Sequence, residues 1–188
     1  SDPGRPIYIR GSRVILRGSG SREGGTVIKM VKFLPPANPN QLWTSPYMFN
    51  FEPLNPSDGR LAKITENARR ETFWITVDNT SNLSVGQWIT LYMNNISAVE
   101  DFLHPFQAES IWTNIFTNGI QVREKHTIAE IQGNRIRLGE PLHANINALY
   151  SWSVRGYQHL EEVGVEDISF HGNWLEFFVH HKDAIHDG

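Results

Sequence analysis

Short runs rich in apolar and β-branched residues, separated by glycines, occupy the first thirty positions of the chain. They lie at residues 7–9, 13–17 and 26–30. Such short runs bounded by turn residues are typical of strands, because β-branched side chains pack well in a sheet. Glycine lets the backbone turn between them, because it has no Cβ to clash. The pattern therefore predicts several short strands joined by tight turns, which indicates an all-β stack.

Residues 32–67 interrupt this pattern with a high density of prolines. Proline cannot donate a backbone hydrogen bond, so the segment suits neither a helix nor a central strand. It nevertheless contains the aromatic residues Trp43, Tyr47, Phe49 and Phe51, and such a composition is too apolar for a disordered linker. We expect an ordered excursion whose aromatic side chains pack over neighbouring strands. Trp43 and Tyr47 are also candidates for contacting a ligand.

Strand-like runs return in the middle of the chain. They lie at residues 72–77, 83–92, 126–131, 135–138 and 150–154. Gln132, Gly133 and Asn134 separate two of these runs and predict a hairpin, because glycine and asparagine tolerate the positive φ of tight turns. We expect a small antiparallel barrel or sandwich.

Residues 96–120 lie between these strands and form the one stretch with helical spacing. Its candidate buried positions are Phe102, Phe106, Ile111 and Ile115. We therefore expect a short helical segment within the predicted barrel.

The end of the chain joins a strand-like run to a dense group of titratable residues. Apolar residues alternate from Val163 to Phe170, which predicts a short strand entering a turn. The titratable group that follows consists of His180, His181, Lys182, Asp183 and His186. On a strand or on a helical turn, part of this group would share one face, so its members are candidate catalytic residues. The alternative is a hydrogen-bonded turn with no chemical role.

The length and composition of the chain limit its domain organisation and argue against some classes of binding partner. The chain has 188 residues, 17 basic and 20 acidic, with a net charge of −3. This length allows one domain with a core, or part of a larger domain with an insertion. The mildly acidic balance argues against nucleic acid, which favours a clustered basic face. No apolar run approaches the roughly 20 residues of a membrane span, so we expect no membrane partner.

The sequence gives little support for a metal or cofactor. The absence of cysteine excludes disulfides and thiolate sites. Imidazoles of His180, His181 and His186 could bind a transition metal, but they lack the paired spacing of a zinc site. Asp183 and Asp187 do not resemble a calcium loop. We expect no metal and no cofactor.

Arg135 and Arg137 lie two residues apart in a predicted strand. On a strand they would share one face and could bind a carboxylate through paired hydrogen bonds. They are candidate substrate-binding residues, with ordinary surface charge as the alternative.

Parts of the chain resemble a known family. Residues 7–20 and 24–28 resemble the early coils of pectate-lyase-like right-handed parallel β-helix proteins, and residues 164–174 resemble the point where such a helix resumes. The runs at 73–92 are similar to a small β-barrel insertion in some carbohydrate-active members. The resemblance implies first β-helix coils and a proline-rich excursion at 1–70, an inserted antiparallel barrel or sandwich at 71–158, and a resumed coil at 159–188.

The resemblance also implies a function. It suggests a secreted protein that acts on a polysaccharide as a lyase or glycoside hydrolase, in which the terminal cluster supplies acid or base. The alternative is a non-catalytic glycan-binding or adhesion module, in which Trp43, Tyr47 and Trp174 contact sugar. Family members commonly have more coils, and each coil is stabilised by its neighbours. We therefore expect a longer native chain, or a partner chain, to cap the open coil.

Overall fold

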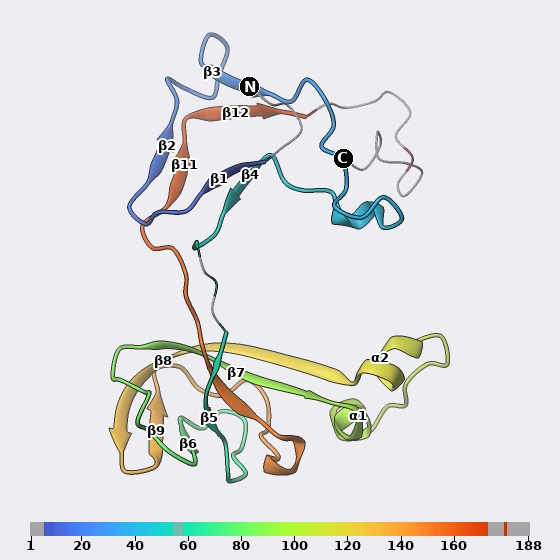
Figure 1. The fold of residues 1–188 in the computed structure, drawn as a ribbon, viewed down its shortest axis with the longest axis vertical. Coiled ribbons are helices and arrows are strands. Elements are labelled where there is room, and N and C mark those ends of the chain that lie inside the picture. Colours follow the sequence, from blue (N-terminus) through green and yellow to red (C-terminus); the bar gives the residue numbers. More distant parts are fainter. Residues whose placement is uncertain (1–5, 55, 57, 173–178, 180–188) are drawn as a thin grey trace. The chain divides into compact units, whose positions relative to one another are not determined.

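The computed structural model describes residues 6–54, 56, 58–172 and 179 (Figure 1). The chain divides into two compact units. Unit 1 comprises residues 1–55 and 159–188, and unit 2 comprises residues 56–158. Strands predominate over short helices in the described residues, which confirms the predicted all-β class.

The described part of unit 1 is built from three parallel pairs of strands. β1 (Ile7–Ile9) pairs with β4 (Phe49–Phe51), β2 (Ile15–Arg17) with β11 (Gly164–Glu166), and β3 (Thr26–Lys29) with β12 (Ile168–His171). Each of the first three strands therefore lies beside a strand from later in the sequence (Figure 1). The single run predicted near residue 168 is two strands, because Asp167, with a φ of 54°, turns the chain between them.

Gly18 lies at the corner between β2 and β3. Its N–H donates to the carbonyl oxygen of Glu166 at 2.9 Å. A Cβ at this position would lie 2.2 Å from the carbonyl oxygen of Asp167 and 2.7 Å from Cβ of Thr26. Such distances are far inside van der Waals contact, so glycine is required where the two corners stack.

The aromatic residues of the proline-rich excursion have different environments. Phe49 packs edge to face against Phe170, with the ring centroids 5.8 Å apart, and Phe51 is half-buried. Trp43, in the 3-10 turn η1 (Leu42–Thr44), is 69% exposed, and Tyr47 is 78% exposed. The predicted packing holds for the two phenylalanines and is wrong for Trp43 and Tyr47.

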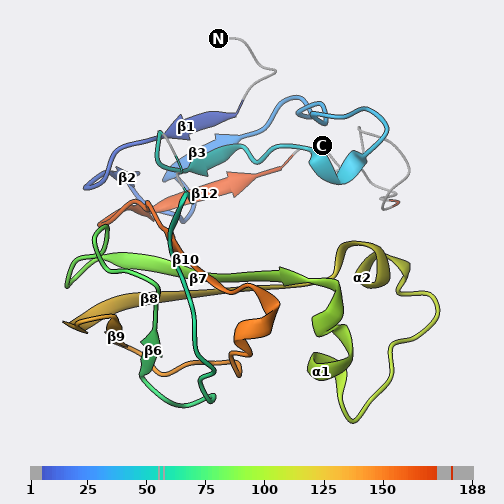
Figure 2. The ribbon, with the colours of Figure 1, turned by 60° about the horizontal axis from the view of Figure 1, so that its bottom comes forward.

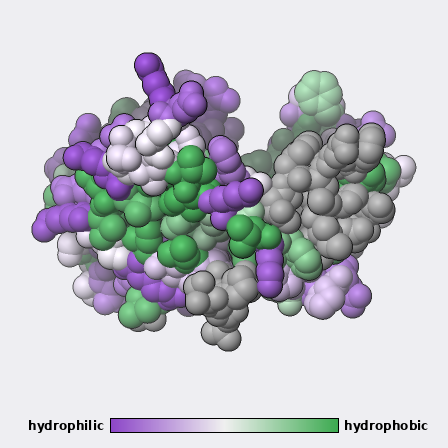
Figure 3. All heavy atoms as spheres, turned by 90° about the horizontal axis from the view of Figure 1, so that it is seen from above, coloured by the Kyte–Doolittle hydropathy of each residue, from purple (hydrophilic) through white to green (hydrophobic). Residues whose placement is uncertain are grey.

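Apolar side chains are unusually exposed on the strands of unit 1. Ile7, Ile15, Val27 and Val165 are each exposed, and Leu34 is the only buried apolar residue among those described in this unit. Figure 3 shows hydrophobic residues gathered into a continuous area on the face that it presents. The described residues of unit 1 therefore enclose little apolar core.

Unit 2 is a curled antiparallel sheet of six strands in the order β5-β10-β7-β8-β9-β6 (Figures 1 and 2). The strands are β5 (Arg60–Lys63), β6 (Trp74–Thr76), β7 (Trp88–Asn95), β8 (Ile120–Gln132), β9 (Arg135–Leu138) and β10 (Ser153–Gly156). Its two edges meet just beyond β5 and β6, where Ile64 and Val77 form an antiparallel bridge. Residues 56–70, grouped with the first coils in the sequence analysis, lie in this unit because β5 pairs with β10.

The core of unit 2 lies inside the curl of the sheet. It includes Ile64, Ile75, Val77, Ile89, Leu91, Met93, Ile128, Ile136, Leu138, Trp152 and Val154. These residues alternate with outward-facing ones along each strand, as a sheet with one buried face requires. Gly133, with a φ of 58°, begins the tight turn between β8 and β9, which confirms the predicted hairpin.

The predicted helical stretch at 96–120 contains only short helices. They are the 3-10 turn η2 (Ile96–Ala98), α1 (Val99–Leu103) and α2 (Thr113–Asn118). A further 3-10 turn, η3 (Ala148–Tyr150), precedes β10. Phe102 packs against the core, but Phe106 and Ile111 are exposed, so their predicted burial is wrong. Pro105 explains the interruption, because it has no N–H with which to continue a helix. Among the described residues, no helix is long and apolar enough to cross a membrane.

Candidate functional site

Strand β8 presents two cations on the outer face of the unit 2 sheet. Arg123 and Lys125 are exposed, whereas their neighbours Glu124 and His126 are buried on the inner face. This alternation follows from the pleat, which directs successive side chains to opposite faces. The strand therefore separates a surface carrying positive charge from a buried acid–imidazole pair.

The adjacent strands complete the outer surface. Across β7, Tyr92 lies opposite Arg123 and Thr90 lies opposite Lys125. β10 lies on the other side of β7 and places Arg155 opposite Thr90. We call Tyr92, Arg123, Lys125, Arg155 and Tyr157 the basic face.

The cations of the basic face lie against aromatic rings. Cζ of Arg155 is 3.7 Å from the ring centroid of Tyr92, and Cζ of Arg123 is 5.0 Å from the same centroid. Nζ of Lys125 is 4.0 Å from the ring centroid of Tyr157 and donates to Oγ1 of Thr90 at 2.7 Å. Such contacts are attractive because the ring face carries negative charge density. They hold three long, flexible side chains in place.

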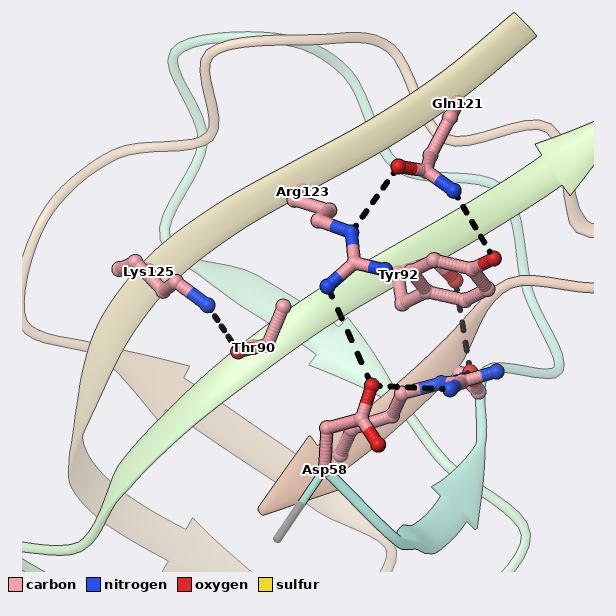
Figure 4. A network of polar contacts seen from close by, with 8 residues as sticks. Asp58, Thr90, Tyr92, Gln121, Arg123 and Lys125 are labelled. Carbon is pink, nitrogen blue, oxygen red and sulfur yellow. Dashed lines mark hydrogen bonds and ion pairs between the residues drawn. The ribbon is translucent and has the colours of Figure 1, made fainter. Parts of the chain in front are cut away.

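Gln121 joins two members of the basic face (Figure 4). Its amide nitrogen donates to the hydroxyl of Tyr92 at 3.2 Å, and its amide oxygen accepts from Nε of Arg123 at 3.1 Å. Nε of Arg155 points toward Oγ of Ser153 at 3.4 Å. These contacts hold the Nε atom of each guanidinium group. The terminal nitrogens of both groups can therefore bind another group.

One carboxylate faces this group of cations. Oδ2 of Asp58 is 3.4 Å from Nη1 of Arg155 and 3.9 Å from Nη1 of Arg123. Within the described part of the chain, no other carboxylate lies within ion-pair distance of Arg123, Lys125 or Arg155. The basic face is therefore locally positive, although the protein as a whole carries a charge of −3.

The environment of Lys125 disfavours its own charge. Partial burial, followed by repulsion from Arg123, lowers the pKa of the Lys125 ammonium below its ordinary value, and Asp58 opposes this shift only in part. A negatively charged ligand beside Lys125 would relieve the repulsion. The electrostatics of the basic face thus favour an anion.

A cavity of about 330 Å³ opens beside these residues. Its walls include Asp58, Arg123, Lys125, Tyr157 and the neighbouring Gly156. Tyr157 packs edge to face against Trp88, with the centroids 6.4 Å apart. The volume is within the range of small-molecule sites. The arrangement offers cationic donors next to aromatic rings, which suits a ligand with both an anionic group and an apolar surface.

Glu124 and His126 lie directly behind the basic face. Oε2 of Glu124 is 3.0 Å from Nε2 of His126 and accepts from the backbone N–H of His143 at 3.1 Å. Burial raises the pKa of Glu124, but the hydrogen bonds from His126 and His143 outweigh it, so the pKa lies below its ordinary value. Nδ1 of His126 has no hydrogen-bond partner among the described residues, and Oε2 of Glu140 is 3.8 Å away. The pair supports the strand rather than contacting a ligand.

The residues proposed from sequence fall into three groups. His180, His181, Lys182, Asp183, His186 and Trp174 lie outside the described residues. Trp43 and Tyr47 belong to unit 1 and do not line the cavity of the basic face. Arg135 and Arg137 do share a strand, β9, but their guanidinium groups lie over Trp74 at 4.9 Å and Phe73 at 5.5 Å. Their role in binding stays a prediction.

None of the residues of the basic face was predicted from the sequence. Residues 121–127 are almost entirely polar, so the first half of β8 lacks the apolar alternation by which strands were identified. One feature of the sequence could have identified it. Arg123 and Lys125 lie two residues apart, as Arg135 and Arg137 do, which places both side chains on one face of a strand. Arg155 and Tyr157 have the same spacing after the apolar run that ends at Val154.

The described residues contain no group of three or more histidines, aspartates or glutamates placed to hold a metal ion. The basic face itself offers nitrogen donors that are positively charged, which do not bind cations. Its positive charge therefore favours an anionic ligand.

Comparison with known proteins gives weak structural similarity only. No protein-family model and no curated protein matches the chain. The resemblance to pectate-lyase-like proteins therefore stays a prediction.

Three solved structures that the chain resembles are phage tailspikes. The gp54 tailspike of Acinetobacter baumannii bacteriophage AP22, in complex with A. baumannii capsular saccharide, has 12% identity and a TM-score of 0.45, over 91% of this chain and 27% of that one. The tailspike gp61 of Pseudomonas phage phi297 has 11% identity and a TM-score of 0.48, over 89% and 22%. The tailspike gp49 of Pseudomonas phage LKA1 has 16% identity and a TM-score of 0.47, over 91% and 26%. This chain thus spans about a quarter of the length of each, and similarity at this level establishes no shared function.

Proposed function

We propose that this chain binds a polysaccharide through the basic face of unit 2. The observation that carries the proposal is the set of cations held against Tyr92 and Tyr157 beside an open cavity. Sugars present hydroxyl groups, and in many cases anionic groups, together with apolar C–H faces. Fixed donors can bind the former, and aromatic rings can pack against the latter.

The basic face suits a saccharide better than a nucleic acid. Binding of nucleic acid depends on contacts between many basic residues and successive phosphates. Here three cations are grouped on a protein of net charge −3, which is a local site rather than a continuous basic surface. The aromatic residues Trp88 and Tyr157 at its margin fit a chain of sugar rings.

Lyase or glycoside hydrolase chemistry stays a separate prediction. It depends on His180, His181, Lys182, Asp183 and His186, which lie outside the described residues. The basic face can bind a polysaccharide whether or not those residues act on it. A secreted location likewise remains a proposal, in keeping with a polysaccharide ligand.

We also propose that the parallel pairs of unit 1 are two successive coils of a right-handed β-helix. Supporting this, β1, β2 and β3 each pair in parallel with a later strand, in the same order along the chain. Stacked coils of a solenoid produce this pairing. Unit 2 would then be an insertion between β4 and β11, closed into a barrel through the bridge between Ile64 and Val77.

A binding assay on a polysaccharide panel tests the proposed function. The 188-residue chain should bind at least one member, and Tyr157→Ala should weaken that binding about fivefold by removing a ring worth roughly 1 kcal/mol. Phe116→Ala is the matched control, because it removes an exposed aromatic ring of unit 2 that does not line this cavity. Its binding should equal that of the wild type.

Two results would contradict the proposal. One is the absence of binding to every polysaccharide in the panel. The other is binding that Tyr157→Ala leaves intact while Arg137→Ala or Trp43→Ala abolishes it, which would move the site to a surface proposed from sequence alone.

A further inference from the structure

We propose that the saccharide bound by the basic face carries a carboxylate, and that Asp58 occupies the position of this carboxylate when no ligand is bound. The inference rests on the proposed function and adds to it the chemical class of the sugar. It also assigns Asp58 a role as an internal competitor.

Two guanidinium groups converge on one oxygen of Asp58. Nη1 of Arg155, on β10, donates to Oδ2 at 3.4 Å. Nη1 of Arg123, on β8, lies 3.9 Å from the same oxygen (Figure 4). Arginine's planar donors suit oxyanions such as carboxylate and phosphate, and the oxyanion that these two arginines hold in the unliganded protein is a carboxylate. The arrangement is therefore that of a carboxylate-binding site.

Asp58 fills this site poorly. Its contacts of 3.4 Å and 3.9 Å exceed the 2.7–2.9 Å or so of a strong charge-assisted hydrogen bond. Its side chain is 58% exposed, and exposed ion pairs of this kind contribute little stability. A ligand carboxylate with better geometry can displace Asp58 at small cost.

The guanidinium groups are fixed before the ligand arrives. Arg155 lies on the ring of Tyr92, and Arg123 is held by Gln121. A ligand therefore meets donors that need little reorganisation, which favours binding. These contacts do not involve Asp58 and would persist after its displacement.

The rest of the site can accommodate the remainder of an acidic sugar. Lys125 and Tyr157 line the same cavity as Asp58 and Arg123. A sugar whose carboxylate replaces Asp58 would have its ring beside Tyr157 and its hydroxyls within the neighbourhood of Lys125. Asp58 carries one negative charge beside three cations. A ligand carboxylate that replaces it leaves the net charge of the site positive, so further anionic sugar units can also bind there.

Asp58→Asn tests the inference directly. The panel should contain uronate-bearing, sulfated and neutral polysaccharides, and the bound uronate polymer should be compared with its carboxyl-reduced form. We expect Asp58→Asn to tighten binding of the uronate polymer about three- to tenfold by removing the competitor, and carboxyl reduction to remove this gain. Glu109→Gln is the matched control, because it makes the same charge change at an exposed position away from the cavity.

The outcomes separate this inference from the proposed function. Binding restricted to neutral or sulfated polysaccharides would overturn the inference and leave the proposed function standing. An unchanged affinity in Asp58→Asn, or an equal gain in Glu109→Gln, would also overturn it. Absence of all binding would overturn both. Asp58→Ser should behave like Asp58→Asn, which separates loss of the carboxylate from any effect of the new amide.

Discussion

At the scale of single residues, the contact between the buried side chains of Glu124 and His126 is costly to break. Both side chains are almost fully buried, and their polar atoms lie 3.0 Å apart. A buried charged or polar group that loses its partner cannot recover hydrogen bonds from water. The outward residues Arg123 and Lys125 lie on the same strand, so this pair also maintains the basic face.

His126→Ala should lower the free energy of unfolding by about 2–3 kcal/mol, because buried Glu124 loses one of its two hydrogen-bond partners and keeps only the backbone N–H of His143. Urea denaturation of the 188-residue chain measures the change. Arg70→Ala is a suitable comparison, since it breaks an exposed pair with Glu71 of the same 3.0 Å length. That variant should change stability by less than about 1 kcal/mol. Equal effects in the two variants would contradict this account of the buried pair.

The pair should also make stability depend on pH in acid. The pKa of Glu124 in the folded protein lies below its ordinary value of 4.5, so the carboxylate stabilises the fold fully above that value. Its contribution is lost as the pH falls through the folded pKa. The stability difference between wild type and Glu124→Gln should therefore shrink on acidification from pH 7. A difference that is constant or grows toward low pH would show that the carboxylate charge does not stabilise the fold.

At the scale of secondary structure elements, the stacked corners of unit 1 depend on Gly18. Its neighbour across the stack is Asp167, between β11 and β12. Two chain segments about 150 residues apart meet there without room for a side chain. This close approach fixes the register of β2 with β11 and of β3 with β12.

Gly18→Ala should destabilise unit 1 by about 1–3 kcal/mol or more, because its methyl group overlaps the Asp167 carbonyl. Gly11→Ala provides the control, since its Cβ would meet nothing closer than 3.7 Å. Thermal unfolding and protease sensitivity report the difference. If Gly18→Ala and Gly11→Ala were equally stable, the corner contact would not hold the strands together.

The secondary structure elements also show which features of the fold can be predicted from sequence patterns. Alternating apolar residues located most of the strands, and the Gly133 turn was predicted because its conformation depends on local chemistry. The first half of β8 was missed, since its outer residues are polar and its inner ones are Glu124 and His126. The site at Asp58 could not be predicted, because it brings together strands distant in sequence, and distant pairing leaves no local pattern.

At the scale of the whole molecule, the two units differ in how much apolar surface they enclose. The buried core cluster lies in unit 2, whereas unit 1 exposes apolar side chains on its described strands. Burial of apolar surface is the main source of stability. Each unit therefore needs its own measurement of stability.

Hydrogen exchange should resolve this difference. We expect amides of β7, β8 and β9 to exchange at least about tenfold more slowly than those of β2, β3 and β11, because opening a unit with a large core costs more free energy. Mass spectrometry of peptides from the 188-residue chain provides both rates under one condition. Equal protection in the two sets of strands would show that unit 1 is stabilised by something other than its described core.

A nuclear magnetic resonance titration would show directly whether the ligand binds to the basic face. The isotope-labelled 188-residue chain would be titrated with the polysaccharide that it binds. The account predicts shifts of the Arg123 and Arg155 side-chain Nε–H signals and of the amides around Tyr92 and Tyr157, with the signals of Arg135, Trp43 and Tyr47 unchanged. Shifts confined to Arg135 and Arg137, or to Trp43 and Tyr47, would place the ligand on another surface and contradict the account.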